Sequence, residues 1–177
     1  MIGKISGIIT FYYNKDSIFN DVSLLSAYMT KNLATEASSA MDEFVITEDE
    51  REIFNECVKQ SVPSIYETIV KLTSGIDDAF NDNAVIEGDD ESGLEREEGK
   101  YVEFKVLDND AYNANILRLV DDTLRDCLKY GILSEFYSIC VNGSLYRIAQ
   151  DKFTANLFQL KQRLFQLKKK VVSTSLS

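Results

Sequence analysis

Apolar side chains recur at intervals of three or four residues along most of this chain, which is the period of one face of an α-helix. The pattern predicts helices over residues 17–40, 47–74, 110–141 and 145–171, the last with a heptad-like seam. The residues predicted to face inward are Ile18, Val22, Leu25, Met29 and Leu33; Phe54, Cys57, Val58, Ser61, Ile65, Ile69 and Leu72; Ile116, Leu119, Val120, Thr123, Cys127, Leu128, Ile132 and Phe136; and Ala149, Phe153, Leu157, Leu160, Leu164, Leu167 and Val171.

Short polar residues stand where the predicted helices begin. Asp16, Asp110 and Ser144 have side chains that can accept a hydrogen bond from a free amide of the first turn. Thr47 is followed three residues later by Glu50, the capping-box arrangement in which each side chain satisfies an amide of the other residue. We therefore expect these residues to fix the helix starts.

Pro63, the only proline, lies inside the second helical pattern. Proline lacks an amide donor and disfavours helical geometry at the residue before it, here Val62. The sequence therefore predicts either a kink in this helix or two helices that meet at this point.

Two segments have the composition of β-strands. Residues 100–107 alternate, with Val102, Phe104 and Val106 on one side, as a half-buried strand does. Residues 7–13, GIITFYY, are β-branched and aromatic, which indicates either a short strand or an extended arm. The partner of the first strand stays open between residues 84–87, the N-terminal segment and a strand of another chain.

Acidic and basic residues are segregated along the chain. Residues 77–99 contain ten Asp and Glu residues and a single base, Arg96, whereas residues 152–177 contain six Lys and Arg residues and no acid. The acidic stretch also loses hydrophobic periodicity, which predicts a long solvated loop. The net charge of −10 argues against general nucleic-acid binding, which needs clustered bases.

Three groups of residues are candidates for contacts with other protein molecules. The last predicted helix carries two phenylalanines off its seam, so it has a second apolar face to bury. Its basic end could lie on an anionic membrane or nucleic acid, but a basic run of this kind more often complements the helix dipole. In an assembly it could also meet the acidic segment of a neighbouring copy, which we treat as a hypothesis. The candidate contact residues are Asp89, Asp90, Glu91, Phe158, Phe165, Lys168, Lys169 and Lys170.

Residue types that carry most enzyme chemistry are scarce. Histidine is absent, and with it the most common general base, the usual catalytic triads and most zinc sites. The sequence contains no glycine-rich phosphate loop. Its cysteines, Cys57, Cys127 and Cys140, are odd in number and have apolar neighbours, which is typical of buried free thiols. We expect no catalytic residues, no cofactor and no metal site.

Clustered carboxylates could in principle bind a cation. The acidic segment lacks the alternating ligand spacing and central glycine of a calcium loop. On the long helix, Asp121, Asp122 and Asp126 lie within helical reach of two arginines, Arg118 and Arg125. This spacing predicts a surface ion-pair network rather than a metal site.

The overall composition, 45% hydrophobic and 27% charged, is that of a soluble globular protein. Its longest apolar run, residues 8–13, is too short to cross a bilayer, and no signal-peptide pattern follows it, so we expect intracellular synthesis and no membrane contact. The predicted fold is mainly α, a helical bundle of four to five helices with a small β element and a long acidic loop. Residues 1–15 would form an N-terminal arm or short strand, residues 16–171 one domain with an insertion at 77–99, and residues 172–177 a tail.

The order of the predicted elements over residues 42–170 resembles that of the head-to-tail connector proteins of tailed bacteriophages. The resemblance rests on a capped helix beginning VITEDEREIFNECV, an insertion, the strand YVEFKVL, a long helix ending LSEFYSI, and a last helix DKFTANLFQLKQRLFQLKKK. It implies a structural subunit of a homo-oligomeric ring between the portal and the tail of a virion, assembled in the host cytoplasm. It also implies contacts with the portal protein and with other tail or collar proteins, and no specific binding of nucleic acid.

Two other interpretations remain open at this point. The chain could be a soluble helical adaptor or regulator that binds its partner through the acidic segment. An enzyme that uses carboxylates and a metal ion ranks behind it, because no ligand pattern supports a metal site. Oligomeric state separates the first two, since a connector forms rings and an adaptor need not.

Overall fold

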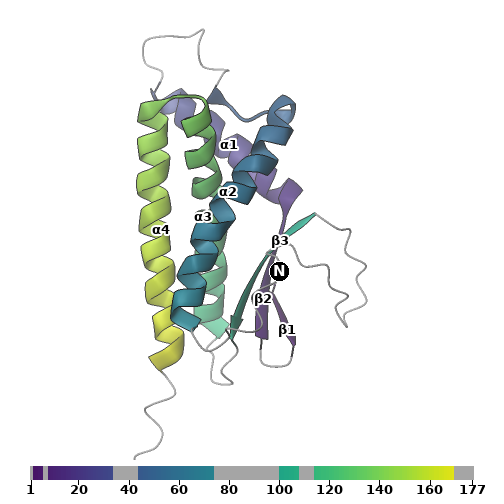
Figure 1. The fold of residues 1–177 in the computed structure, drawn as a ribbon, viewed down its shortest axis with the longest axis vertical. Coiled ribbons are helices and arrows are strands. Elements are labelled where there is room, and N and C mark those ends of the chain that lie inside the picture. The colour runs from purple at the N-terminus through teal and green to yellow at the C-terminus, as the bar shows by residue number, and fades with distance from the viewer. Residues whose placement is uncertain (1, 6–7, 34–43, 74–99, 108–113, 170–177) are drawn as a thin grey trace, which may run out of the picture.

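The computed structural model describes residues 2–5, 8–33, 44–73, 100–107 and 114–169 (Figure 1). They form four α-helices and a small antiparallel sheet, which confirms the predicted mainly α fold with a small β element. The predicted acidic loop, the strand considered at 84–87, the Asp110 cap and the C-terminal tail lie outside the described residues.

The helices form one bundle in which α3 is central. Helix α4 packs antiparallel along α3, α2 packs against both, and α1 crosses α3 at the end near the α3–α4 turn (Figure 1). The sheet lies at the side of the molecule away from α4 (Figure 1). The helix bounds are α1 Lys15–Leu33, α2 Arg51–Thr73, α3 Ala114–Ile139 and α4 Gly143–Lys169, with a 3-10 turn, Glu48–Glu50, ahead of α2.

The sheet has the order β1-β2-β3, with β1 Ile2–Ile5, β2 Ile8–Asn14 and β3 Tyr101–Leu107. Strand β2 pairs with both neighbours in antiparallel fashion, and Phe11 stands opposite Phe104. Of the partners considered for residues 100–107, the N-terminal segment is therefore the one observed, and that segment is a strand. The inward-facing residues of the two strands belong to the same core as the helices: Ile9, Phe11, Tyr13, Val102, Phe104 and Val106.

The buried faces of the helices largely match the predicted stripes. Half-buried positions are Leu25, Ile116 and Leu157, and Leu119 is exposed. Near the start of α3 the buried side is centred on Val120 and Leu124, roughly 100° to 140° around the helix from Leu119. The predicted residues that are buried are Ile18, Val22, Met29, Phe54, Cys57, Val58, Ser61, Ile65, Ile69, Val120, Thr123, Cys127, Leu128, Ile132, Phe136, Ala149, Phe153, Leu160 and Leu164.

Helix α1 is capped by Asn14, not by Asp16 as the sequence suggested. The Asn14 Oδ1 atom accepts a hydrogen bond from the Ser17 amide at 3.0 Å. Because the helix begins at Lys15, Asp16 already lies in its first turn, where it forms an ion pair with Arg51 at 2.8 Å. The prediction missed the helix start by two residues.

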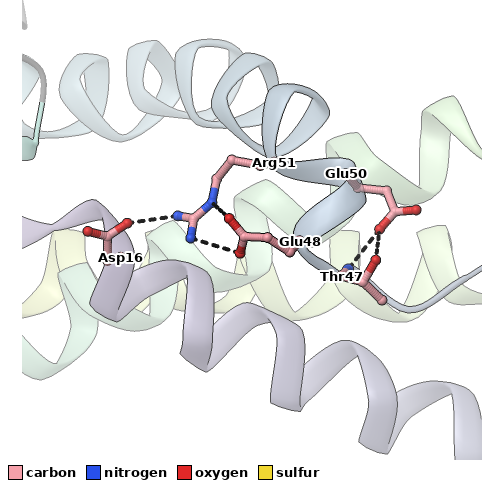
Figure 2. A network of polar contacts seen from close by, with 5 residues as sticks. All are labelled: Asp16, Thr47, Glu48, Glu50 and Arg51. Atoms are coloured by element: carbon pink, nitrogen blue, oxygen red, sulfur yellow. Dashed lines mark hydrogen bonds and ion pairs between the residues drawn. The ribbon is translucent and has the colours of Figure 1, made fainter.

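Arg51 joins the start of α1 to the start of α2 (Figure 2). Besides Asp16, its guanidinium binds Glu48 at 2.9 Å and lies 3.7 Å from the centroid of the Phe19 ring. Figure 2 also shows the predicted capping box, in which the Thr47 amide and hydroxyl both donate to the Glu50 carboxylate. The capping-box prediction is confirmed, with the 3-10 turn inserted between the cap and α2.

Helix α2 runs through Pro63 as a single helix, so the prediction of two helices is wrong. Pro63 is exposed, whereas Val62 and Ile65 on either side of it are buried in the core. Burial of these flanking side chains favours helical continuity by more than the lost hydrogen bond of the proline disfavours it.

The α3–α4 turn places a branched residue in the left-handed region. Val141 has φ 54°. The Asn142 amide donates to the Tyr137 carbonyl at 3.0 Å and the Val141 amide to that of Ser138 at 3.2 Å, which is a Schellman motif. Asn142 Oδ1 then accepts from the Leu145 amide at 3.0 Å, so Asn142 caps α4. The predicted cap, Ser144, already lies inside the helix, which begins at Gly143.

Replacing Val141 with glycine is expected to stabilise the fold. The left-handed region costs a branched residue about 1–2 kcal/mol, and the 88% exposed side chain loses little packing. The extra entropy of glycine in the unfolded chain offsets part of this gain, so we expect a net rise of about 1 kcal/mol in unfolding free energy. Urea denaturation measures it, and Val141→Asn, which also tolerates this geometry, should give a smaller rise. A loss of stability in both variants would contradict the turn geometry.

Candidate interaction surface

The outer face of α4 carries two large aromatic side chains. Phe158 is 61% exposed and Phe165 is 47% exposed. They are seven residues apart, two turns of helix, so they lie along one line on the surface. Lys161 lies between them in sequence, is exposed, and forms no ion pair with another described residue. We call Phe158, Lys161 and Phe165 the α4 stripe; the prediction that both phenylalanines lie off the buried seam is confirmed.

The α4 stripe includes none of the other predicted contact residues. Asp89, Asp90 and Glu91 lie outside the described residues, as does Lys170. Lys168 and Lys169 fall within the bounds of α4, but their side chains are outside the described set. Their roles stay predictions.

Further apolar side chains on the surface were missed by the sequence reasoning. Leu24 is 74% exposed and Tyr28 is 64% exposed, four residues apart on α1, and Ile139 is exposed beside the α3–α4 turn. The signal was available, because Leu24 and Tyr28 lie off the apolar stripe predicted for residues 17–40.

A cleft of about 270 Å³ opens where β2 runs into α1 beside α3. Its position brings together residues that are far apart in the chain, and the sequence reasoning did not predict it. The cleft combines aromatic walls with carboxylates. Its lining includes Tyr12, Tyr101, Ile18, Asp121, Asp122 and Arg125.

One wall of the cleft is held by Tyr13 and Asp121. The Tyr13 hydroxyl donates to the Asp121 carboxylate at 2.7 Å and lies 3.0 Å from the carbonyl oxygen of the same residue. Burial raises the pKa of Tyr13 well above its usual value, and the hydrogen bond and the negative charge of Asp121 raise it further. The neutral phenol therefore ties β2 to α3 throughout the neutral pH range.

Arg125, one turn after Asp121 on α3, forms an ion pair that corrects the predicted network. Arg125 binds Asp21 of α1 at 2.8 Å and donates to the Ser17 hydroxyl at 3.1 Å, instead of pairing with the aspartates of its own helix. Asp126 pairs with Lys129 at 2.6 Å. Helical spacing alone did not find these partners, because the Arg125 contact depends on how α1 packs on α3.

The cleft is therefore acidic where it meets solvent. The charge of Arg125 is matched by Asp21, and neither Asp121 nor Asp122 forms an ion pair with another described residue. Carboxylates beside tyrosine rings bind positively charged groups, through ionic hydrogen bonds and cation–π contacts. The cleft therefore brings two carboxylates, Asp121 and Asp122, and one guanidinium, Arg125, next to tyrosine side chains.

Two of the three cysteines, Cys57 and Cys127, are buried thiols that stay protonated. All three are free; Cys57 and Cys127 are buried and Cys140 is half-buried. Burial raises the pKa of both Cys57 and Cys127 to about 12, so neither forms a thiolate at neutral pH.

Within the described part of the chain, no three His, Cys, Asp or Glu residues are grouped so that they could hold a metal ion. Comparison with family models, curated proteins and solved structures finds no match. None of the helices among the described residues is long and apolar enough to span a membrane.

Proposed function

We propose that this protein is a structural subunit of a tailed-bacteriophage virion, which assembles with copies of itself into a connector ring between the portal and the tail. Its role is to form protein–protein contacts rather than to catalyse a reaction. The partners are further copies of this chain within the ring, and portal and tail or collar proteins above and below it.

The observation that carries the proposal is the α4 stripe. Burying one phenylalanine side chain contributes about 1.5–3 kcal/mol of favourable free energy. An interface that covers both exposed rings would therefore be stabilised by a multiple of the value for one. Single exposed apolar residues are common, but aligned ones on a long helix mark contact surfaces more often. A second copy or a virion partner can cover them.

Two further features support the proposal. The capped helix, strand, long helix and final antiparallel helix occur in the order on which the resemblance to connector proteins rests. The charge segregation of the sequence, acidic at 77–99 and basic after 152, suits rings, in which one patch of a subunit meets a different patch of the next.

Replacing both phenylalanines, Phe158→Ser with Phe165→Ser, is expected to abolish self-association without loss of fold. Both side chains are exposed, so the melting temperature should stay close to that of the unchanged protein, whereas the association loses its apolar anchors. Sedimentation velocity across a concentration series measures the effect.

A matched control is the pair Leu24→Ser and Tyr28→Ser on α1, which removes a similar exposed apolar area from another element. Self-association should survive in this control. Equal loss of association in both variants would mean that general surface hydrophobicity, and not the α4 stripe, drives the contact.

A further inference from the structure

A closed ring needs two different, complementary patches on each subunit. The α4 stripe and the cleft meet the geometric requirement because they face opposite ways from α3. Asp121 contacts Tyr13 of β2, whereas Thr123 accepts a hydrogen bond from Arg163 of α4. Two residues along a helix are roughly 200° apart, so the cleft and α4 lie on opposite sides of α3. In Figure 1, α4 lies at the left of the molecule and the sheet at the right.

The two patches also carry opposite charges. The stripe presents one cation, Lys161, flanked by two phenyl rings. The cleft presents Asp122, exposed and without an ion-pair partner among the described residues, beside tyrosine rings and a cavity of about 270 Å³.

We propose that the α4 stripe of one copy docks at the cleft between β2, β3, α1 and α3 of the next, with Lys161 binding Asp122 and with Phe158 and Phe165 packed beside it, next to Tyr101. The contact is heterologous, so it repeats around a ring instead of closing a two-fold dimer. This inference rests on the proposed function, since it names the surfaces by which the subunits would join.

Charge exchange tests the pairing. Lys161→Glu and Asp122→Lys are each expected to weaken self-association by at least about tenfold, because each puts like charges in contact. The double variant, which carries both changes, restores opposite charges in the reverse order and should recover most of the lost affinity. Sedimentation velocity at low and at high salt measures all of these proteins, and the difference between single and double variants should shrink as salt rises.

Lys152→Glu is the matched control. Lys152 is exposed on the same helix, and its replacement by Glu changes the net charge by the same amount as Lys161→Glu. Lys152 lies nine residues before Lys161, which puts it roughly 180° around α4 from the stripe's lysine. It should associate like the unchanged protein.

The results distinguish a wrong pairing of the two surfaces from a failure of the ring proposal itself. If the unchanged protein assembles and the single variants assemble equally well, or the double variant stays as weak as the singles, the pairing is wrong while the ring proposal stands. If the unchanged protein does not self-associate at any concentration, both fail. Recovery in the double variant supports both.

Discussion

Replacing Gly131 with valine is expected to lower the free energy of unfolding by about 3 kcal/mol, the upper part of the range for overpacked cores. A Cβ atom at this position would lie 2.9 Å from Ser61 Cβ and 3.1 Å from Phe153 Cε2. Ser61 Cβ is fixed to the backbone of α2, so α2 and α3 must move apart to make room. At Gly131, therefore, α2, α3 and α4 lie close enough together to leave no room for a side chain.

Two variants test whether this close approach causes the expected loss of stability in Gly131→Val. Ser61→Gly in the Gly131→Val background removes the nearest atom and should recover part of the loss. Gly143→Ala, where no atom lies within 4 Å, should be neutral or slightly stabilising. Urea denaturation of these proteins gives the comparison. A Gly131→Val protein as stable as the unchanged chain would mean that the three helices do not pack as described.

A steep loss of stability above pH 9 is the second large effect. Burial raises the pKa of Cys57 and Cys127 to about 12 in the folded protein, from an ordinary value of 9.0. Between these values the unfolded chain releases both protons and the folded chain keeps them, so the unfolded state binds fewer protons and stability falls as pH rises. Each thiol contributes up to about 1.4 kcal/mol per pH unit, and below about pH 9 their contribution is fully present.

Denaturation under reducing conditions between about pH 8 and about pH 11 measures this slope. The raised pKa of Tyr13 should add to the fall above its ordinary value of 10.0. A variant with Cys57→Ala and Cys127→Ala is expected to have a lower but flatter stability profile, because the two buried thiols no longer titrate. Cys140→Ser is the matched control, because it removes a thiol that is only half-buried. The same slope in all three proteins would rule out the buried thiols as its cause.

Local periodicity was sufficient to predict the helices and the strand at 100–107. Phe54 to Ile69 and Val102 to Val106 are buried where their spacing placed them, because burial on one side of a helix or strand imposes that spacing. The helix starts were less predictable. Asn14 and Asp16 both have cap-forming side chains, and only the packing of α1 after β2 decides between them.

Long-range pairing could not be predicted in the same way. The register of β2 with β3 joins Phe11 to Phe104, and the Arg125 ion pair joins α3 to α1. Neither leaves a periodic signal in the sequence. The exposed phenylalanines of the α4 stripe could be predicted, since they lie off the seam of one helix, whereas the cleft draws on β2, β3, α1 and α3 at once.

The mass of the purified protein tests the central claim most directly. Native mass spectrometry, or mass photometry over a concentration series, is expected to show a closed oligomer of one defined mass in equilibrium with free subunits, and the Phe158→Ser, Phe165→Ser variant is expected to show free subunits alone. A chain that stays monomeric at every concentration, in both forms, would contradict the claim that it builds a ring.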